Sequence, residues 1–131
     1  MTRRTLRPEL SEKEKVIVRM RKDGYTYKQI AEKFGYPSYQ NPQGIYYRAL
    51  DKLRKWQYIE KNDPELIEAA ECAGLRFDQL LRIYNCLLRN KVFRNYKSMS
   101  EAELRNLDGI GDLYLNVLLD SKWLSEHNRV L

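Results

Sequence analysis

The sequence has little of the chemistry from which most enzyme active sites and metal centres are built. Its 131 residues include one histidine, His127, and two cysteines, Cys72 and Cys86. No further Cys or His residues stand at metal-ligand spacing from them, and a lone histidine in a polar run has no catalytic partners. We therefore expect no enzyme activity, no metal and no cofactor, and we expect both cysteines to be small buried residues.

Long apolar runs are also absent. No segment approaches the roughly 18 apolar residues that a membrane-spanning helix needs, and no signal-peptide stretch follows the basic start. No run alternates apolar and polar residues over the length of a strand. These absences predict an all-α protein in the cytoplasm with no membrane partner. The content of 43% hydrophobic and 32% charged residues is that of a chain that folds.

Acidic residues are scarce in one half only. Residues 1–56 hold 14 Lys and Arg against 6 Asp and Glu, a net charge of +8, whereas residues 57–131 hold 10 against 12, a net charge of −2. A positive surplus attracts polyanions through the release of their counterions. We expect the N-terminal half to bind nucleic acid, with an ordinary solvated surface as the alternative.

Helix signals divide this basic half into a flexible basic arm at residues 1–9 and three helices. Ser11 and Glu14 have capping-box spacing at the start of the first helix, which ends at Gly24. Thr26 caps the second helix, which ends at Gly35. The third helix is expected to start near Asn41 and Pro42, to run to Lys55, and to be covered at its end by Trp56. The predicted inward-facing residues are Val16, Ile17, Met20, Ile30, Ala31, Phe34, Ile45, Tyr46, Ala49, Leu50 and Leu53.

These three helices have the features of a helix-turn-helix, because a small residue, a turn glycine and apolar inner faces occur in the required order. The string Tyr27-Lys28-Gln29-Ile30-Ala31-Glu32-Lys33-Phe34-Gly35, followed by Arg48-Ala49-Leu50-Asp51-Lys52-Leu53-Arg54, resembles region 4 of bacterial sigma factors. The resemblance covers residues 10–56 and implies promoter DNA binding. The turn is one residue longer than in that family, so its base preference does not transfer.

The helix-turn-helix interpretation assigns the DNA contacts to the third helix and its surroundings. The residues expected to face base edges in the major groove are Tyr39, Gln40, Asn41, Gln43 and Tyr47. Because Asn and Gln can bond both N6 and N7 of adenine, a site containing adenine is expected. The residues expected to hold phosphates are Lys28, Lys33, Arg48, Lys52, Arg54 and Lys55, with a solvated helix face as the alternative.

The second half begins with a predicted linker at residues 57–63, which is polar and lacks apolar periodicity. A helical domain follows at residues 64–131. Asp63 and Pro64 start its first helix, which ends at Gly74. The next helix is expected over residues 78–90, a short one from Ser100 to Asn106, and the last over residues 112–123.

This domain resembles the C-terminal domain of the RNA polymerase alpha subunit over residues 75–124. The likeness rests on Leu81-Arg82-Ile83-Tyr84-Asn85-Cys86-Leu87, Ser100-Glu101-Ala102-Glu103-Leu104, Gly109-Ile110-Gly111 and Leu115. It implies a helix-hairpin-helix fold in which Arg82 and Asn85 enter the minor groove of DNA and the turn at Gly109 and Gly111 holds a phosphate. Asp112, where the family has a basic residue, competes with that phosphate. The alternative is a protein-binding surface at Leu113 and Tyr114.

Together these features predict a DNA-binding transcription regulator that acts at promoters with RNA polymerase or a sigma factor. A phage or other mobile element is one source that we consider, and a homodimer is compatible with the sequence. Two alternatives stay open. One is an adaptor that binds polymerase or sigma without specific DNA binding, and the other is an accessory protein of DNA packaging or replication. The site sequence and the direction of regulation are not predicted.

Overall fold

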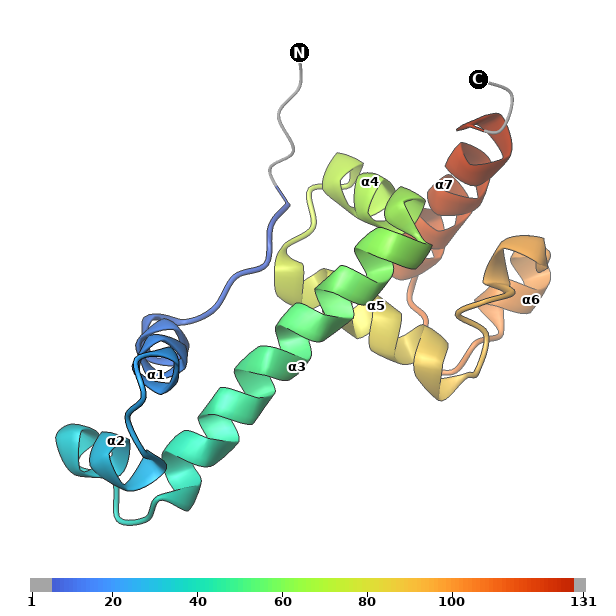
Figure 1. Cartoon of the computed structure of the whole chain (residues 1–131). Coiled ribbons are helices and arrows are strands. Elements are labelled where there is room, and N and C mark those ends of the chain that lie inside the picture. The colour runs from blue at the N-terminus through green and yellow to red at the C-terminus, as the bar shows by residue number, and fades with distance from the viewer. Residues whose placement is uncertain (1–5, 129–131) are drawn as a thin grey trace. The chain divides into compact units, whose positions relative to one another are not determined.

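The computed structural model describes residues 6–128, and all regular structure in that range is helical, as predicted. The helices are α1 Glu12–Lys22, α2 Tyr27–Phe34, α3 Gln40–Asn62, α4 Pro64–Cys72, α5 Phe77–Arg89, a 3₁₀ turn at Tyr96–Ser98, α6 Glu101–Arg105 and α7 Asp112–Asn128 (Figure 1). Within residues 6–128, none of the helices combines the length and the apolar character needed to cross a membrane.

The chain divides into two compact units, which we call the N-terminal unit and the C-terminal unit. The N-terminal unit is Pro8–Lys55, and the C-terminal unit consists of the residues from Trp56 onward together with Leu6 and Arg7. The boundary between them falls inside α3.

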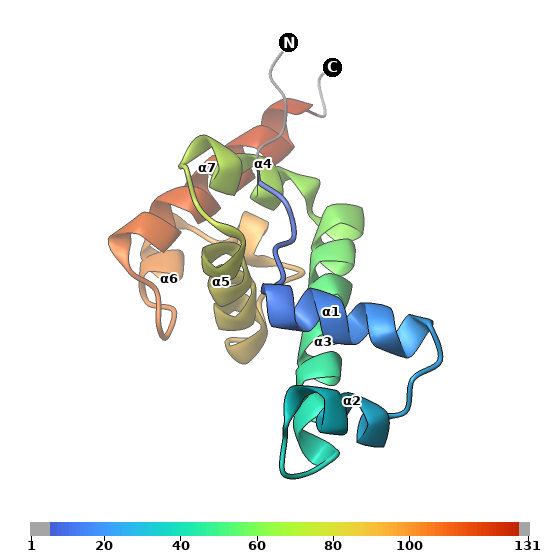
Figure 2. The same cartoon turned by 90° about the vertical axis from the view of Figure 1, so that its left-hand side faces the viewer.

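In the N-terminal unit, α1 and α2 pack beside the first part of α3, and α1 crosses that helix in Figure 2. Both predicted helix starts are confirmed as complete capping boxes. Ser11 pairs with Glu14, and Thr26 pairs with Gln29. The core is small: Ile17, Met20 and Ile30 are buried, and Tyr36, Ile45 and Tyr46 pack against them.

Two predicted core positions of the N-terminal unit are wrong. Val16 is 40% exposed, because Val18 takes the inward position on α1 instead. Phe34 is also exposed and stacks on Tyr36, with ring centroids 5.7 Å apart, because the turn after Gly35 brings Tyr36 back over the last turn of α2. Tyr36 therefore fills part of the space that we assigned to Phe34.

The predicted linker at residues 57–63 is also wrong, because α3 continues without a break to Asn62. Ile59 is fully buried and Trp56 is nearly so, and both belong to the core of the C-terminal unit. Their spacing of three residues places them on one face of a helix. Within residues 57–63 the sequence has one isoleucine among mostly polar residues, and this is too few apolar positions to reveal a helical periodicity.

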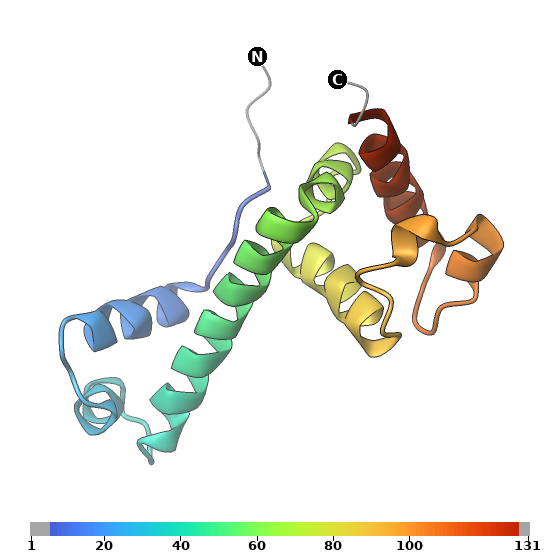
Figure 3. The ribbon, with the colours of Figure 1, turned by 45° about the vertical axis from the view of Figure 1, so that its right-hand side comes forward.

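The C-terminal unit has a much larger core, in which 19 residues of the described range are buried, and every one of its helices contributes to it. Helix α4 packs mainly on α7, and the two lie side by side in Figures 1 and 3. Leu6 is 4% exposed and joins this core, and its backbone amide donates to Glu71 Oε2 at 3.3 Å. The predicted flexible arm is therefore wrong at Leu6, and residues 1–5 lie outside the described range.

Three further predictions about the C-terminal unit need correction. Helix α5 begins at Phe77, where the Arg76 backbone amide donates to Gln79 Oε1 at 2.9 Å, and α7 extends past Trp123 to Asn128. Cys72 is exposed at the end of α4, because the apolar face of that helix ends at Ala70. Cys86 is buried as predicted, and the Ser100–Glu103 capping box is present.

A buried polar cluster joins the start of α4 to the 3₁₀ turn and to α7. The hydroxyl of Tyr96 donates to the carboxylate of Asp63 and lies 2.7 Å from Ser121 Oγ, and Lys97 pairs with the same carboxylate. All of Asp63, Tyr96 and Ser121 are at most 3% exposed. Asp63 precedes α4 as predicted, but its side chain makes no capping bond because it is engaged in this cluster.

Candidate nucleic-acid interface

The N-terminal end of α3 is built by a compact turn at residues 36–39. Ser38 Oγ accepts the amide of Gln40 at 3.1 Å, and the carbonyls of Ser38 and Tyr39 accept the amides of Asn41 and Gln43. The helix starts slightly before the predicted Asn41. Pro42 lies in its first turn, as predicted, where a missing amide hydrogen leaves no intrahelical bond unmade.

The five residues predicted to face bases gather at this end of α3. Tyr39, Gln40, Asn41 and Tyr47 are exposed, with Tyr39 and Tyr47 each at 53%, and Gln43 is half-buried. Gln40, Gln43 and Tyr47 follow one another at spacings of three and four residues, so they lie on one stripe of the helix. The opposite face carries Ile45, Tyr46 and Ala49 and packs inward. We call the exposed face, with Asn41 and Arg48, the α3 stripe.

The predicted phosphate contacts divide into two groups. Lys28, Lys33, Arg48 and Arg54 are exposed and form no ion pair within residues 6–128. Lys52 instead pairs with Glu14 at 3.0 Å, and Lys55 pairs with Asp51 at 3.1 Å. Neutralised cations add less to phosphate binding, because a paired carboxylate competes for the same charge. The first group is therefore the stronger set of candidates.

Glu14 is the residue that ties Lys52 to the fold. Burial raises the pKa of its carboxyl, but hydrogen bonds from the Ser11 amide and from Lys52 outweigh burial and leave the pKa below its usual 4.5. The carboxylate thus caps α1 and binds α3 at the same time. The Lys52–Glu14 pair therefore has a structural role, whereas the sequence predicted Lys52 only as a phosphate contact.

Sequence reasoning missed an aromatic group that lies beside the α3 stripe. Tyr27 on α2 contacts Tyr46 and Tyr47 on α3, with ring centroids 6.0 and 6.5 Å away, and the Arg21 guanidinium lies 4.2 Å from the centre of the Tyr27 ring. Burial and a hydrogen bond with Tyr47 raise the pKa of Tyr27, so its hydroxyl stays neutral. In the sequence, Tyr27 is recognisable only as the first residue after the helix cap Thr26. The residues that contact its ring lie on α1 and α3, so local spacing does not reveal them.

Comparison with protein-family models, with curated proteins and with solved structures found no match to this chain. The site therefore has to be interpreted from its own residues.

The second predicted surface lies on α5 and the turn before α7. Arg82 and Asn85 are exposed and one helical turn apart, and Arg82 lies 3.8 Å from Asp78. Arg89, one turn further along the same face, reaches the glycine turn: its guanidinium donates to the Asp108 carbonyl at 3.3 Å. Sequence reasoning did not single out Arg89, because this partner is 19 residues away.

The glycine turn is held from inside by the end of α5. Asn90 donates to the carbonyl of Asp108 and accepts its amide, and Cys86 Sγ donates to the same carbonyl at 3.2 Å. Gly109 has a φ of +84°, and a Cβ there would lie 2.2 Å from Arg89. Gly109 is thus explained by backbone conformation and by packing, without a phosphate.

The start of α7, which follows this turn, has some features that suit a phosphate or protein contact and some that do not. Gly111 is open to solvent, the Asp112 side chain is 96% exposed, and Arg105 lies 3.9 Å from that carboxylate. Leu113 is exposed at 46%, whereas Tyr114 is half-buried and packs against the core. Of the two residues predicted to contact a partner protein, only Leu113 is exposed.

Proposed function

We propose that this protein is a DNA-binding transcription regulator whose α3 stripe enters the major groove. The observation that carries the proposal is the joint exposure of amide side chains and unpaired cations at one end of α3. Gln40 and Asn41 supply paired donors and acceptors for base edges, and Arg48 lies about two turns further on. Amides specify bases and cations hold phosphates, and DNA recognition requires both.

The electrostatics of the N-terminal unit support the same role. Residues 8–55 hold 11 Lys and Arg against 6 Asp and Glu, a net charge of +5. Lys28 and Lys33 are exposed on α2 of the same unit and would bind the phosphates that flank the groove. Asp51 also lies on the stripe, but its pairing with Lys55 limits repulsion of the backbone at that turn.

A gel-shift assay at low salt with promoter DNA tests the proposal. Arg48→Glu is expected to weaken binding by tenfold or more, because it replaces a phosphate contact by a repulsive charge. The matched control is Lys15→Glu, which makes the same charge change on α1 of the same unit. Lys52→Glu is a poor test because it places a second carboxylate beside Glu14. A wild-type protein that never shifts promoter DNA, or an Arg48→Glu variant that shifts it as well as Lys15→Glu does, would overturn the proposal.

Selection of bound sequences from a random DNA pool separates a promoter regulator from a packaging or replication accessory. Recovery of promoter-like elements, with adenine at positions that change when Asn41 is replaced by Ala, supports the proposed function. Recovery of a different site overturns the promoter role while leaving DNA binding intact.

We propose further that the C-terminal unit contacts RNA polymerase or a sigma factor and not DNA. The support is its net charge of −2 over residues 57–131 and the acidic start of α7 at Asp112. Retained polymerase binding by Arg48→Glu in a pull-down with purified polymerase is the expected result. Loss of polymerase binding together with DNA binding would contradict separate roles for the two units.

A further inference from the structure

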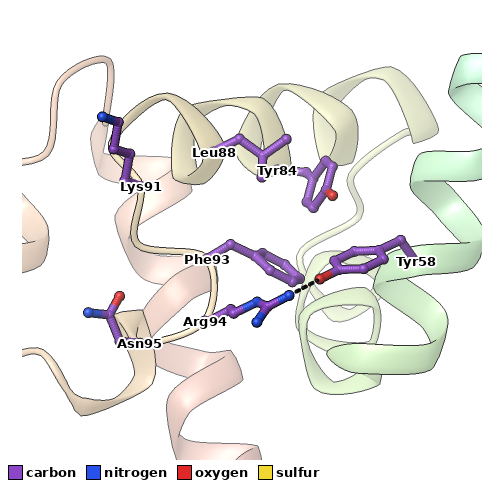
Figure 4. A pocket seen from close by; sticks show the side chains of 7 residues that line it. All are labelled: Tyr58, Tyr84, Leu88, Lys91, Phe93, Arg94 and Asn95. Carbon is purple, nitrogen blue, oxygen red and sulfur yellow. Dashed lines mark hydrogen bonds between the residues drawn. The ribbon is translucent and has the colours of Figure 1, made fainter.

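A hollow of about 510 Å³ opens on the C-terminal unit, and its lining includes none of the residues discussed as DNA contacts. Figure 4 shows its walls: Tyr84 and Leu88 come from α5, Tyr58 from the last part of α3, and Phe93, Arg94 and Asn95 from the segment after α5. Lys91 stands at the edge of the same hollow. This volume lies within the range of protein sites that bind a ligand or an anchoring side chain.

The floor of the hollow is an aromatic cluster in which the rings of Tyr58, Tyr84 and Phe93 pack against one another. Ring centroids are 5.0 Å apart for Tyr84 and Phe93, with the planes at 86°, and 5.6 Å apart for Tyr58 and Phe93. Edge-to-face packing of this kind is favourable and rigid. Leu88 is nevertheless 43% exposed and Tyr58 36% exposed, so apolar surface faces solvent around a preformed depression. Such a surface suits an incoming apolar side chain.

The rim of the hollow is positively charged although the C-terminal unit as a whole is not. Its lining includes Lys91 and Arg94 and no acidic residue. Arg94 donates to the Tyr58 hydroxyl at 3.4 Å, and neither cation has an ion pair within the described part of the chain. Two further hollows continue from Arg94, one past Lys97 and one toward Lys122. Lys97 is paired with Asp63 and Glu65, so among the described residues the cations without an ion pair beside the aromatic floor are Lys91 and Arg94.

Lys91 has a backbone conformation that lysine rarely adopts. Its φ is +59°, and it is the only residue with positive φ in the described range that is not glycine. The position follows the end of α5, where glycine is the usual residue because it has no Cβ. Lys91 thus lines the edge of the hollow in a strained backbone conformation, and its long side chain can turn toward a bound carboxylate. Strain of this kind is often kept at functional sites.

We propose that this hollow binds a peptide segment of a partner protein in which a large apolar side chain is flanked by Asp or Glu. The apolar side chain would lie on the aromatic floor, and the carboxylates would face Lys91 and Arg94. The inference deepens the proposed function, on which it rests, by giving the polymerase- or sigma-binding unit a specific contact. Nucleic acid fits less well, because its affinity depends on many phosphates, whereas a short acidic peptide meets only the local cations of a unit with net charge −2.

The test begins with a phage-displayed library of random linear peptides selected against the full-length protein. Enriched peptides are synthesised with a fluorescent label, and their binding is measured by anisotropy. We expect the enriched sequences to carry Asp or Glu beside an aromatic or aliphatic residue. Arg94→Glu is expected to weaken binding roughly tenfold, because it places a negative charge where the peptide's carboxylates lie. Leu88→Glu is expected to weaken binding by a similar factor, because it places a charge in the apolar surface that receives the apolar side chain. Lys61→Glu, a charge reversal on exposed α3 outside the hollow, is the control and should leave binding unchanged.

Lys91→Gly separates binding from folding. The substitution removes the cation and relieves the positive φ, so the melting temperature should stay the same or rise while peptide affinity falls. A variant that folds better but binds less well cannot be explained by unfolding. Equal peptide affinity in Lys91→Gly and wild type would contradict the role of Lys91.

Other results of these experiments would overturn the peptide proposal or assign the hollow to nucleic acid. No enrichment, enriched peptides without acidic residues, or equal binding by all variants would overturn the proposal. Binding of a labelled single-stranded oligothymidylate that is lost in Arg94→Glu would assign the hollow to nucleic acid and would also overturn it. Arg48→Glu should lose promoter DNA but keep the peptide. Failure of the peptide experiment therefore leaves DNA binding by α3 untouched, and failure of DNA binding leaves the peptide result to stand.

Discussion

At the scale of single residues, two buried acids each hold helices together through several partners. Glu14 caps α1 and binds Lys52 on α3, and Asp63 binds Tyr96 and Lys97 at the start of α4. A buried charge is tolerated only when its partners replace the water that it has lost. The pKa of Glu14 is shifted in the fold, so the stability of the N-terminal unit depends on pH in the acid range. The pKa of Tyr96, the partner of Asp63, is also shifted, so the stability of the C-terminal unit depends on pH in the alkaline range.

Tyr96→Phe is expected to lower the free energy of unfolding at neutral pH by about 1–3 kcal/mol, because Asp63 loses a buried hydrogen bond. Burial, followed by the Asp63 charge, raises the pKa of Tyr96 well above 10.0. The stabilisation by the neutral hydroxyl is complete below pH 10.0 and is lost as the pH rises through the higher folded pKa. Urea unfolding should therefore show the difference between wild type and Tyr96→Phe shrinking at alkaline pH.

The control for this experiment is Tyr39→Phe. Tyr39 is 53% exposed, so its removal should change the free energy of unfolding little at any pH. A difference between wild type and Tyr96→Phe that stays constant into alkaline pH would contradict the assignment.

Glu14→Gln keeps the shape of the side chain but removes its charge, and we expect it to destabilise the N-terminal unit by about 1–2 kcal/mol at neutral pH. The pKa of Glu14 is lowered in the fold, so the stabilisation by its carboxylate is present above pH 4.5 and is lost as the pH falls through the lower folded value. Protection of α1 amides from hydrogen exchange measures this locally. Glu12→Gln, at an exposed pair with Lys15, should have little effect, and equal losses in both variants would refute the prediction.

At the scale of elements, glycines have different roles in α3 and at the end of α2. Gly44 lies inside α3, where a Cβ would meet only the flexible end of Arg48, at 3.6 Å. Gly35 ends α2 with a φ of +73°, a conformation that side chains with a Cβ disfavour. The same residue type therefore weakens one helix and terminates another.

Gly44→Ala should raise the free energy of unfolding by up to about 1 kcal/mol, because alanine has the higher helix propensity and the site has room. Gly35→Ala should lower it by about 1 kcal/mol, because the left-handed backbone becomes strained. Thermal unfolding followed by circular dichroism compares the two identical chemical changes. Shifts of the same sign in both variants would show that the local backbone does not decide the effect.

At the scale of the whole molecule, the two units have cores of unequal size. The N-terminal unit buries three large apolar residues in its core cluster, whereas the C-terminal unit buries 19 residues in its own. Stability scales with the apolar surface removed from water, so the N-terminal unit depends far more on its caps and on the Glu14–Lys52 pair.

Native-state hydrogen exchange should therefore show faster opening of α1 and α2 than of α5 and α7. Ile30→Ala, which removes a fully buried side chain from the small core, should cost roughly 2–4 kcal/mol and should abolish the protection of α1 and α2 amides. The amides of α5 and α7 should keep theirs. Uniform loss of protection along the chain would show instead that the two units unfold as one.

Much of the local structure could be predicted from the sequence because it depends on neighbours within four residues. The capping boxes at Ser11 and Ser100, the cap at Thr26 and the glycine after α2 need only such contacts. The all-helical class and the unequal distribution of charge follow from composition and period alone. The exposure of the residues at the start of α3 was also predictable, because apolar spacing assigns the opposite face to the core.

Tertiary structure alone decided the features that depend on distant partners. The buried positions of Ile59 and Leu6 and the pairing of Lys52 with Glu14 each result from a surface supplied by another segment. The hollow at Tyr58, Tyr84 and Phe93 needs three segments to form. Periodicity describes one helix at a time, and the free energy of packing depends on which faces meet. That is why the sequence determined the helices and the charge of this protein, and only the fold determined its cores and its second candidate binding site.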